Sequence, residues 1–344
     1  MRAVVVHAPK DLRVEEVPEQ ALGPNEVRVA IAAGGICGSD LHYYNHGGTG
    51  AIRLREPMVL GHEVAGTVVE IGPDVSRVAI GTRVAVNPSR ACGRCVRCQE
   101  GLHNHCLDMR FLGSAMRFPH VQGGFREDLV VHEVQAVAIA AHVTMGEAAM
   151  AEPLAVCLHA VERAGALNGR RVLVTGCGPI GALVIMAARF AGAGVVVATD
   201  VQDFALSTAR ASAADVAINT AADPDALDRE VAKAGPFDVA FEASGNAGAL
   251  RTALLHLRPR GILVQLGLGG DIPLPINSVV TREIDLRGTF RFDTEFDLAV
   301  ALMNAKRLDV RPLLSATMPF SDAEAAFGLA GDRSRAVKVQ LSFV

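Results

Sequence analysis

The sequence predicts an α/β protein with two domains, one rich in β-strands and one doubly wound around a parallel sheet. The chain has 344 residues and a hydrophobic content of 50%, which is enough for two buried cores. Short β-branched segments broken by Gly and Pro fill its first third, whereas strands and helices alternate from about Gly169 onward. The first pattern is typical of a compact β-domain, and the second of parallel strands joined by crossover helices.

The elements follow this division. In the first third, the predicted strands are residues 3–6, 27–32, 63–71 and 83–86. The doubly wound part begins with a strand at 171–175 and a helix from Pro179 to about Gly192, which has Pro in its first turn and apolar residues along one face. Its later predicted strands are residues 195–199, 216–218, 238–241 and 261–266. The alternation stops at residues 288–292, and a helix at 295–304 precedes a last strand at 336–341.

The composition argues against nucleic acid and membrane surfaces as partners. The formal net charge is −4, and Lys and Arg are scattered among acidic residues. The chain has no Trp and two Tyr, too few for a base-stacking surface, and it has no apolar run of 18 residues. Seven cysteines in a chain of this size do not resemble a secreted disulfide framework. We therefore expect a cytoplasmic protein.

A glycine-rich turn predicts a dinucleotide site. The run Gly176-Cys177-Gly178-Pro179-Ile180-Gly181 follows an apolar strand and opens an amphipathic helix, and Asp200 ends the next strand. Gly176 would permit the tight turn, Gly178 would let the backbone approach a pyrophosphate, and Gly181 would let helix and strand pack closely. Asp200 would bind the adenosine ribose hydroxyls, and no Arg or Lys follows it, so NAD is favoured over NADP. The alternative is a similar turn that binds no nucleotide.

Four crowded cysteines predict a structural zinc site. Cys92, Cys95, Cys98 and Cys106 lie close enough for one loop to wrap a tetrahedral ion. Such a closed shell leaves no position for substrate. An iron–sulfur cluster and free thiols are the alternatives, and His103 or His105 in the same loop could replace a thiol.

A second set of zinc-binding residue types is spread along the chain. Cys37, His62 and Glu63 offer one thiolate, one imidazole and one carboxylate, which leaves a fourth position open, as catalytic zinc requires. Read singly, Cys37 could be a small buried residue and His62 a core histidine.

Together these motifs resemble the zinc-containing medium-chain dehydrogenases. The segment Cys37-Gly-Ser39-Asp40, the element Gly61-His62-Glu63, the four-cysteine lobe and the glycine fingerprint occur in the order and spacing of that family, over essentially the whole chain. The resemblance is strongest to the polyol branch around sorbitol dehydrogenase, because Glu follows the zinc His and Ala151-Glu152-Pro153-Leu154 opens a helix. It implies a discontinuous GroES-like zinc domain over 1–150 and 288–344 and a Rossmann NAD-binding domain over 151–287.

The resemblance also implies residue roles. Cys37, His62 and Glu63 match the ligands of a catalytic zinc, and Glu152 matches a carboxylate that reaches the metal through water or replaces Glu63. Asp40 matches the acid that accepts the His62 ring N–H. Ser39 matches the hydroxyl that takes the substrate proton and passes it through the nicotinamide ribose to His42. The positions that match the substrate pocket are Tyr43, Phe118 and Arg291.

Three segments, residues 108–120, 123–125 and 286–292, are similar to the L-idonate dehydrogenase group, whose reaction interconverts L-idonate and 5-keto-D-gluconate. The carboxylate of such a sugar acid would meet Arg291, or else Arg117 or His120. The alternatives are a sorbitol, xylitol or butanediol dehydrogenase and a catalytically silent NAD-sensing scaffold. A zinc-free quinone reductase is excluded by the two cysteine-containing sites. By resemblance we expect two zinc ions per chain, a small-molecule substrate, and a homodimer or homotetramer.

Overall fold

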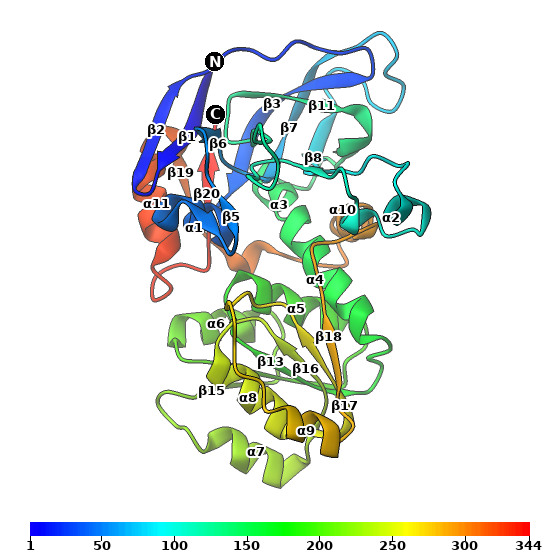
Figure 1. The fold of residues 1–344 in the computed structure, drawn as a ribbon, viewed down its shortest axis with the longest axis vertical. Coiled ribbons are helices and arrows are strands. Elements are labelled where there is room, and N and C mark those ends of the chain that lie inside the picture. The colour runs from blue at the N-terminus through cyan, green and yellow to red at the C-terminus, as the bar shows by residue number, and fades with distance from the viewer. The chain divides into compact units, whose positions relative to one another are not determined.

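The computed structural model describes residues 1–344, apart from the side chain of Thr49, and the chain forms two compact units (Figure 1). Unit 1 comprises Met1–Glu152, Phe296–Asp332 and Lys338–Val344, and unit 2 comprises Pro153–Glu295 and Arg333–Val337. Both units are therefore discontinuous in sequence. The combination of a β-rich unit and a parallel-sheet unit is the fold class that the sequence predicts.

Unit 1 consists mainly of antiparallel strands. Its largest sheet has the order β12-β8-β7-β3-β20-β19, and β11 also pairs with β3. These strands are β3 (Glu26–Gly35), β7 (Glu63–Ile71), β8 (Arg83–Val86), β11 (Asp128–His132), β12 (Ala136–Ala138), β19 (Leu314–Pro319) and β20 (Lys338–Ser342). The smaller sheets contain β1 (Arg2–Ala8), β2 (Asp11–Glu16) and β6 (Met58–Val59), then β9 (Ser89–Arg90) with β10 (Arg110–Phe111), and β4 (Gly48–Thr49) with β5 (Ile52–Arg53). Strand β3 is central because it pairs with β7, β11 and β20.

Strand β20 brings the end of the chain into the middle of this sheet. It runs antiparallel to β3, with Gln340 opposite Gly35, and parallel to β19. Its residues are buried from Lys338 to Leu341, including the lysine. A charged residue is thus fixed in the interior, beside the strand ends that carry the zinc-ligand candidates.

The helices and turns of unit 1 are short. They are α1 (Gly38–His46), α2 (Val96–Gln99), α3 (Met145–Ala149) and α11 (Ala323–Gly331), with 3₁₀ turns η1 (His103–His105), η2 (Glu133–Gln135), η3 (Arg311–Leu313) and η4 (Phe320–Asp322). Helix α1 begins after Cys37, and its first turn contains Asp40, whose carboxylate accepts the Cys37 N–H. The helix ends at Gly47, which has the left-handed backbone that suits glycine. Helices α4 (Ala151–Ala164) and α10 (Glu295–Asn304) each run from one unit into the other.

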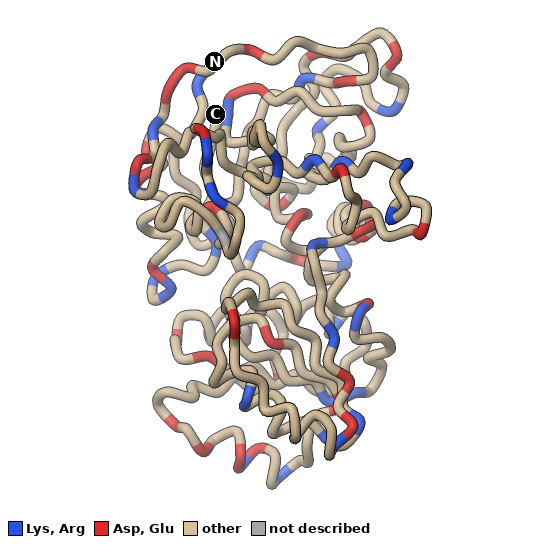
Figure 2. The backbone as a smooth tube through the Cα atoms, in the orientation of Figure 1, with Lys and Arg blue, Asp and Glu red and all other residues tan. Residues whose placement is uncertain are grey.

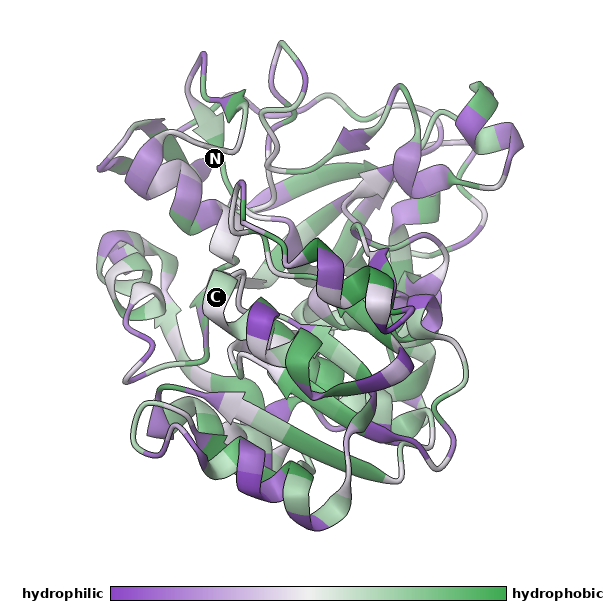
Figure 3. Ribbon diagram, turned by 60° about the horizontal axis from the view of Figure 1, so that its bottom comes forward, coloured by the Kyte–Doolittle hydropathy of each residue, from purple (hydrophilic) through white to green (hydrophobic). Residues whose placement is uncertain are grey.

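Unit 2 is a doubly wound domain. Its six strands are all parallel and have the order β15-β14-β13-β16-β17-β18, so the first strand lies inside the sheet and the order reverses next to it. The strands are β13 (Arg171–Thr175), β14 (Val195–Asp200), β15 (Val216–Asn219), β16 (Phe237–Glu242), β17 (Leu257–Gln265) and β18 (Asp285–Gly288). The helices are α5 (Pro179–Phe190), α6 (Asp203–Ala211), α7 (Ala226–Ala234), α8 (Ala247–His256) and α9 (Ile276–Thr281). Strands of this sheet are hydrophobic along most of their length, whereas the helices carry hydrophilic stretches (Figure 3).

The predicted elements agree with the structure to within a few residues for most strands. Strands β2, β11, β12 and β19 of unit 1 were not predicted, and two features of unit 2 also differ. Strand β18 at residues 285–288 is absent from the prediction because it is a partly exposed edge strand with charges at Asp285 and Arg287. Strand β17 begins at Leu257, four residues before the predicted start at 261, despite Pro259 within it.

The chain returns to unit 1 later than the expected boundary at residue 288. Residues 289–295 still belong to unit 2, which follows from the pairing of β18 with β17 and from the contact between His159 and Glu295. Residues 333–337 also belong to unit 2.

Acidic and basic residues are interspersed along both units, without a long stretch of one sign (Figure 2). Among the described residues, no helix combines the length and the apolar character needed to cross a membrane.

Candidate metal centres and cofactor loop

Cys37, His62 and Glu63 converge in unit 1. Cys37 precedes α1, and Glu63 begins β7 directly opposite Gly35 at the end of β3. One ligand atom from each of the three residues lies within 4.8 Å of the others. Gly35 makes room for this group, since a Cβ there would approach the Glu63 carboxylate to 2.1 Å. A thiolate, an imidazole nitrogen and a carboxylate oxygen are ordinary zinc ligands, so the donor set fits zinc with one position left open.

Asp40 links the segment that carries Cys37 to the segment that carries His62 through hydrogen bonds. It is fully buried, and its carboxylate accepts the N–H groups of Cys37 at 2.9 Å and Gly61 at 3.2 Å. The His62 Nδ1 lies 3.8 Å from the nearer Asp40 oxygen, which is too far for a hydrogen bond. The predicted bond from the His62 ring to Asp40 is therefore not formed, because the carboxylate is directed at backbone N–H groups.

A residue that the sequence analysis missed, Lys338, neutralises Glu63. Its Nζ is 2.7 and 2.8 Å from the two Glu63 oxygens and 3.2 Å from the Ile36 carbonyl oxygen. Both side chains are almost fully buried, with 2% and 1% of their surface exposed. A single lysine within the apolar strand 336–341 was the available sequence signal.

Burial raises the pKa of two acidic groups beside Glu63. Burial, together with the charge of Glu63, raises the pKa of the Cys37 thiol to about 11. Burial also raises the pKa of Glu152, the second residue of α4, to about 8; His62 lowers it, and Glu63 raises it further. The site therefore contains more acidic groups than the single positive charge of Lys338 can neutralise. A divalent cation would supply the additional positive charge. Of the two candidate carboxylates described, Glu63 belongs to the 4.8 Å group and Glu152 does not.

The proposed proton-relay residues share one face of α1. Ser39 and His42 are three residues apart, so their side chains lie one turn apart on that helix. Ser39 is half-buried and His42 is exposed, which suits an inner and an outer end of a proton path. Tyr43 is buried on the same helix, and its hydroxyl accepts the Ala115 N–H at 3.0 Å.

Phe118, predicted in the substrate pocket, lies at the surface of unit 1. Its ring is 57% exposed, stacks under Arg55 and lines a separate cavity of about 400 Å³. The aromatic ring that packs on the site is Phe111, whose centroid is 5.5 Å from that of His62.

Two candidates for a substrate carboxylate are engaged elsewhere. The Arg117 guanidinium pairs with Asp108. His120 is buried, its Nδ1 is 2.8 Å from the Arg117 carbonyl oxygen, and its Nε2 accepts the Arg55 N–H. The third candidate, Arg291, belongs to unit 2, where its guanidinium stacks on Phe290 with its carbon 5.0 Å from the ring centroid.

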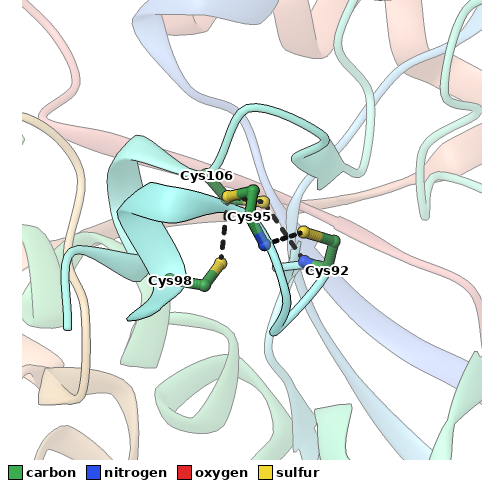
Figure 4. A group of neighbouring side chains, drawn as sticks. All are labelled: Cys92, Cys95, Cys98 and Cys106. Atoms are coloured by element: carbon green, nitrogen blue, oxygen red, sulfur yellow. Dashed lines mark hydrogen bonds between the residues drawn. The ribbon is translucent and has the colours of Figure 1, made fainter. Parts of the chain in front are cut away.

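The four-cysteine lobe brings its thiols together (Figure 4). The ligand atoms of Cys92, Cys95, Cys98 and Cys106 lie within 4.8 Å of one another. The Cys95 Sγ is 3.6 Å from Cys98 Sγ and 3.9 Å from Cys106 Sγ, and backbone N–H groups of Cys92 and Asp108 point at Cys106. Backbone N–H groups of Cys98 and Leu107 lower the pKa of Cys95 to about 6, whereas burial raises the pKa of Cys98 to about 12. Four thiols that converge with a preformed thiolate among them fit a tetrahedral zinc ion.

The glycine turn after β13 has the backbone that its predicted roles require. Gly176 has φ +87°, in the left-handed region, and a Cβ on Gly181 would lie 1.8 Å from the Gly176 carbonyl oxygen. Gly178 begins α5 ahead of Pro179 and Ile180, and a Cβ there would meet nothing within 4 Å. The first and third glycines are thus required by the turn and its packing, whereas the second leaves open space before a helix N-terminus.

Asp200 closes this loop. Its carboxylate accepts the Cys177 N–H at 2.7 Å and the N–H groups of Val201 and Gln202. The Cys177 thiol is buried and directed at the Thr199 carbonyl oxygen. A second buried carboxylate, Glu242, was not anticipated from the sequence. It accepts the N–H groups of Ser244 and Gly245 and the Gln265 amide, and so joins the loops that follow β16 and β17.

Comparison with known proteins gives consistent results over nearly the whole chain. Residues 23–141 match the family model described as alcohol dehydrogenase GroES-like domain, and residues 179–305 match the one described as zinc-binding dehydrogenase. L-idonate 5-dehydrogenase (NAD(P)(+)) of Escherichia coli (strain K12) is 46% identical over 93% of this chain and 92% of that protein. Sorbitol dehydrogenase of Bacillus subtilis (strain 168) is 34% identical over 92% of this chain and 89% of that protein. The crystal structure of L-idonate 5-dehydrogenase from Escherichia coli superposes with a TM-score of 0.94 at 44% identity, and the match covers 99% of this chain and 97% of that chain.

Proposed function

Because this chain belongs to the zinc-binding dehydrogenase family, we propose that it oxidises the C5 hydroxyl of L-idonate to 5-keto-D-gluconate, with NAD as the hydride acceptor. The observation that carries the proposal is the convergence of Cys37, His62 and Glu63 within 4.8 Å in a chain that is 46% identical to an L-idonate 5-dehydrogenase. A non-catalytic scaffold would have no need to keep these donors together with Ser39.

The proposal assigns Cys37, His62 and Glu63 to a catalytic zinc ion, with Glu152 nearby, and the four cysteines of the lobe to a structural one. When bound, the catalytic ion would supply Lewis acidity, which lowers the pKa of an alcohol and stabilises the alkoxide. The protein holds the donors: Asp40 fixes the backbone of two ligand segments, and Lys338 neutralises Glu63. The closed Cys₄ shell would stabilise residues 92–106 without contacting substrate.

The proposed proton path uses the face of α1. The Ser39 hydroxyl takes the proton of the substrate alcohol, and the His42 imidazole delivers it to water. The half-buried Ser39 and the exposed His42, one turn apart, support this order.

The cofactor assignment rests on the turn Gly176 to Gly181 and on Asp200. The helix N-terminus at Gly178 offers backbone N–H groups to a pyrophosphate, and the Asp200 carboxylate favours ribose hydroxyls over a 2′-phosphate. We assign Tyr43 and Arg291 to the substrate, with Arg291 directed at the sugar-acid carboxylate. Phe118 remains a predicted substrate residue, and its ring lines a cavity of unit 1 that Arg117 and His120 also line.

A polyol dehydrogenase is the second candidate function, because relatives named sorbitol dehydrogenase are 33–35% identical over more than 90% of this chain. Rates with L-idonate, 5-ketogluconate, sorbitol and xylitol, each with NAD(H) and NADP(H), separate the two. The proposal expects kcat/KM to be at least tenfold higher for L-idonate with NAD than for sorbitol. Equal or higher kcat/KM with sorbitol would assign the chain to the polyol group.

The carboxylate assignment has its own experiment. Arg291→Gln should weaken the binding of L-idonate more than the binding of sorbitol, since only L-idonate carries a charge for the guanidinium to bind. An equal effect on both substrates would remove Arg291 from the carboxylate role. We also propose a homodimer or homotetramer, which light scattering of the zinc-loaded protein would test.

A further inference from the structure

A cavity of about 400 Å³ in unit 1 is lined by an unusual number of cationic side chains. Arg90, Arg110 and Arg117 all line it, and Glu26 is the one carboxylate among its described lining residues. His132 lines it as well, as does His120, whose two ring nitrogens contact backbone atoms of Arg55 and Arg117. The volume lies in the range of pockets that bind small molecules.

The cavity is separate from the zinc site, although one strand borders both. Arg110 and Leu112 line the cavity, whereas Phe111 between them turns its ring to His62 at a centroid distance of 5.5 Å. Successive side chains along an extended segment point to opposite sides, so strand β10 lies between the two.

Two of the arginines are held next to each other by the backbone. Arg90 in β9 and Arg110 in β10 are directly paired across a two-stranded antiparallel ribbon, so their side chains leave the same face. Like charges at directly opposed positions destabilise such a pair. The ribbon therefore carries an electrostatic cost that an anion bound between the two guanidinium groups would remove.

Acidic side chains pair with two of the three arginines but not with Arg110. The Glu26 Oε1 is 3.8 Å from Arg90, and Glu26 Oε2 accepts the Gly23 N–H. Arg117 is paired with Asp108, while Arg110 forms no ion pair with any residue that the structure describes. Arg110 thus lines the cavity without an acidic partner, directly opposite Arg90, whose ion pair with Glu26 is long at 3.8 Å.

We propose that this cavity is a second small-molecule site, which binds the phosphate group of a phosphate monoester between Arg90 and Arg110. A phosphate carries about −1.5 to −2 charges at neutral pH on a single group and can accept hydrogen bonds from two guanidinium forks, whereas a carboxylate carries one charge. Phosphate alone would leave most of a 400 Å³ cavity empty, so the ligand is an organic phosphate of about the size of a hexose phosphate.

The test uses the zinc-loaded full chain and glucose 6-phosphate as the probe, with titration calorimetry at constant ionic strength. We expect saturable binding with one site per chain and at least a tenfold weaker affinity in Arg90→Gln and Arg110→Gln. Arg13→Gln is the matched control, because Arg13 is an exposed arginine of the same unit that pairs with Asp11. Absent binding, or equal weakening in the control, would overturn the proposal.

A second measurement separates a ligand site from a structural role of the arginine. Without ligand, Arg110→Gln should melt at the same or a higher temperature than the wild type, because the like-charge contact is removed. With saturating glucose 6-phosphate the order should reverse. A lower melting temperature of the unliganded variant would mean that Arg110 serves an internal contact. Tighter binding of tartrate than of glucose 6-phosphate would assign the cavity to dicarboxylates and overturn the phosphate assignment.

Discussion

Lys338 and Glu63 form a buried ion pair across 275 residues of sequence, with the lysine Nζ within 2.8 Å of both carboxylate oxygens. Burial alone would lower the pKa of Lys338, but the charge of Glu63 raises it above its ordinary value, so the lysine stays a cation. The pair thus fixes the charge state of the acid that lies beside the Cys37 thiol and the His62 ring.

Removal of the lysine should be costly. Lys338→Met would leave Glu63 buried and unpaired, and we expect a loss of about 3–5 kcal/mol in the free energy of unfolding of unit 1. Urea denaturation followed by circular dichroism measures this loss. Lys233→Met, at an exposed position in α7, is the control and should stay within about 0.5 kcal/mol of wild type.

A double variant makes the assignment specific. Lys338→Met combined with Glu63→Gln removes both charges and should recover part of the lost stability, because no uncompensated charge remains. If Lys338→Met were as stable as Lys233→Met, the ion pair would have no role in holding Glu63.

Ser39→Ala should separate proton transfer from binding. Loss of the hydroxyl should lower kcat by about 10² to 10⁴, the usual contribution of a positioned proton-transfer group, with zinc content and NADH affinity unchanged. Stopped-flow turnover, elemental analysis and NADH titration measure the three quantities. Ser321→Ala, at an exposed position, is the control. Near-normal turnover of Ser39→Ala would show that the proton leaves by another route.

The thiols of the Cys₄ lobe should differ sharply in reactivity after zinc is stripped with a chelator. Alkylation of Cys95 by iodoacetamide should reach half its maximal rate near pH 6, while Cys98, with a pKa near 12, stays slow up to pH 9. Peptide mass spectrometry resolves the two sites. Matching pH profiles for the two cysteines would contradict the arrangement of N–H donors around Cys95.

The same shift predicts the pH range in which the lobe weakens. The pKa of Cys95 falls from an ordinary 9.0 to about 6, so the folded lobe binds this proton less tightly than the unfolded chain does. The stabilisation is complete above pH 9 and is lost as the pH falls through about 6. Zinc retention by the lobe should decline over that range, since protons compete with the metal for the thiolate.

Alanine substitutions at two glycines of the cofactor turn should have different effects. Gly181→Ala places a methyl group 1.8 Å from the Gly176 carbonyl oxygen and should lower the melting temperature of the domain. Gly178→Ala meets open space, so it should melt as the wild type does but bind NADH at least tenfold more weakly, because its methyl group occupies the approach of the phosphates. Wild-type affinity in Gly178→Ala would place the cofactor elsewhere.

The sequence predicted those parts of the fold and site that depend on local patterns. Strand β13, the glycine turn and α5 were placed correctly because three local signals coincide within twenty residues. These signals are an apolar strand, the turn residues and the start of an amphipathic helix. The Cys₄ lobe was also predicted, since its four ligands share one loop. Edge strand β18 was missed because its exposed charges hide the β pattern.

Features that arise from pairing of distant strands could not be predicted in this way. Lys338 reaches Glu63 only because β20 pairs with β3, and no local pattern records that register. Asp40 was expected to accept the His62 ring N–H. Its carboxylate accepts two backbone N–H groups instead, and this choice depends on distances of tenths of an ångström that the sequence does not show. The ring of Phe111 was not expected at His62 for a similar reason, because its direction depends on the strand at Arg110–Phe111.

The late position of β20 has a consequence for biosynthesis. While the chain is being translated, β3, β7 and the residues around Cys37 and His62 leave the ribosome long before the strand that completes their sheet. Most of unit 2 is synthesised in this interval, and Glu63 has no lysine partner until β20 emerges. The sheet that carries the zinc-ligand candidates is therefore completed only after β20 has been made, and a truncation that removes β20 would leave Glu63 as an unpaired buried acid.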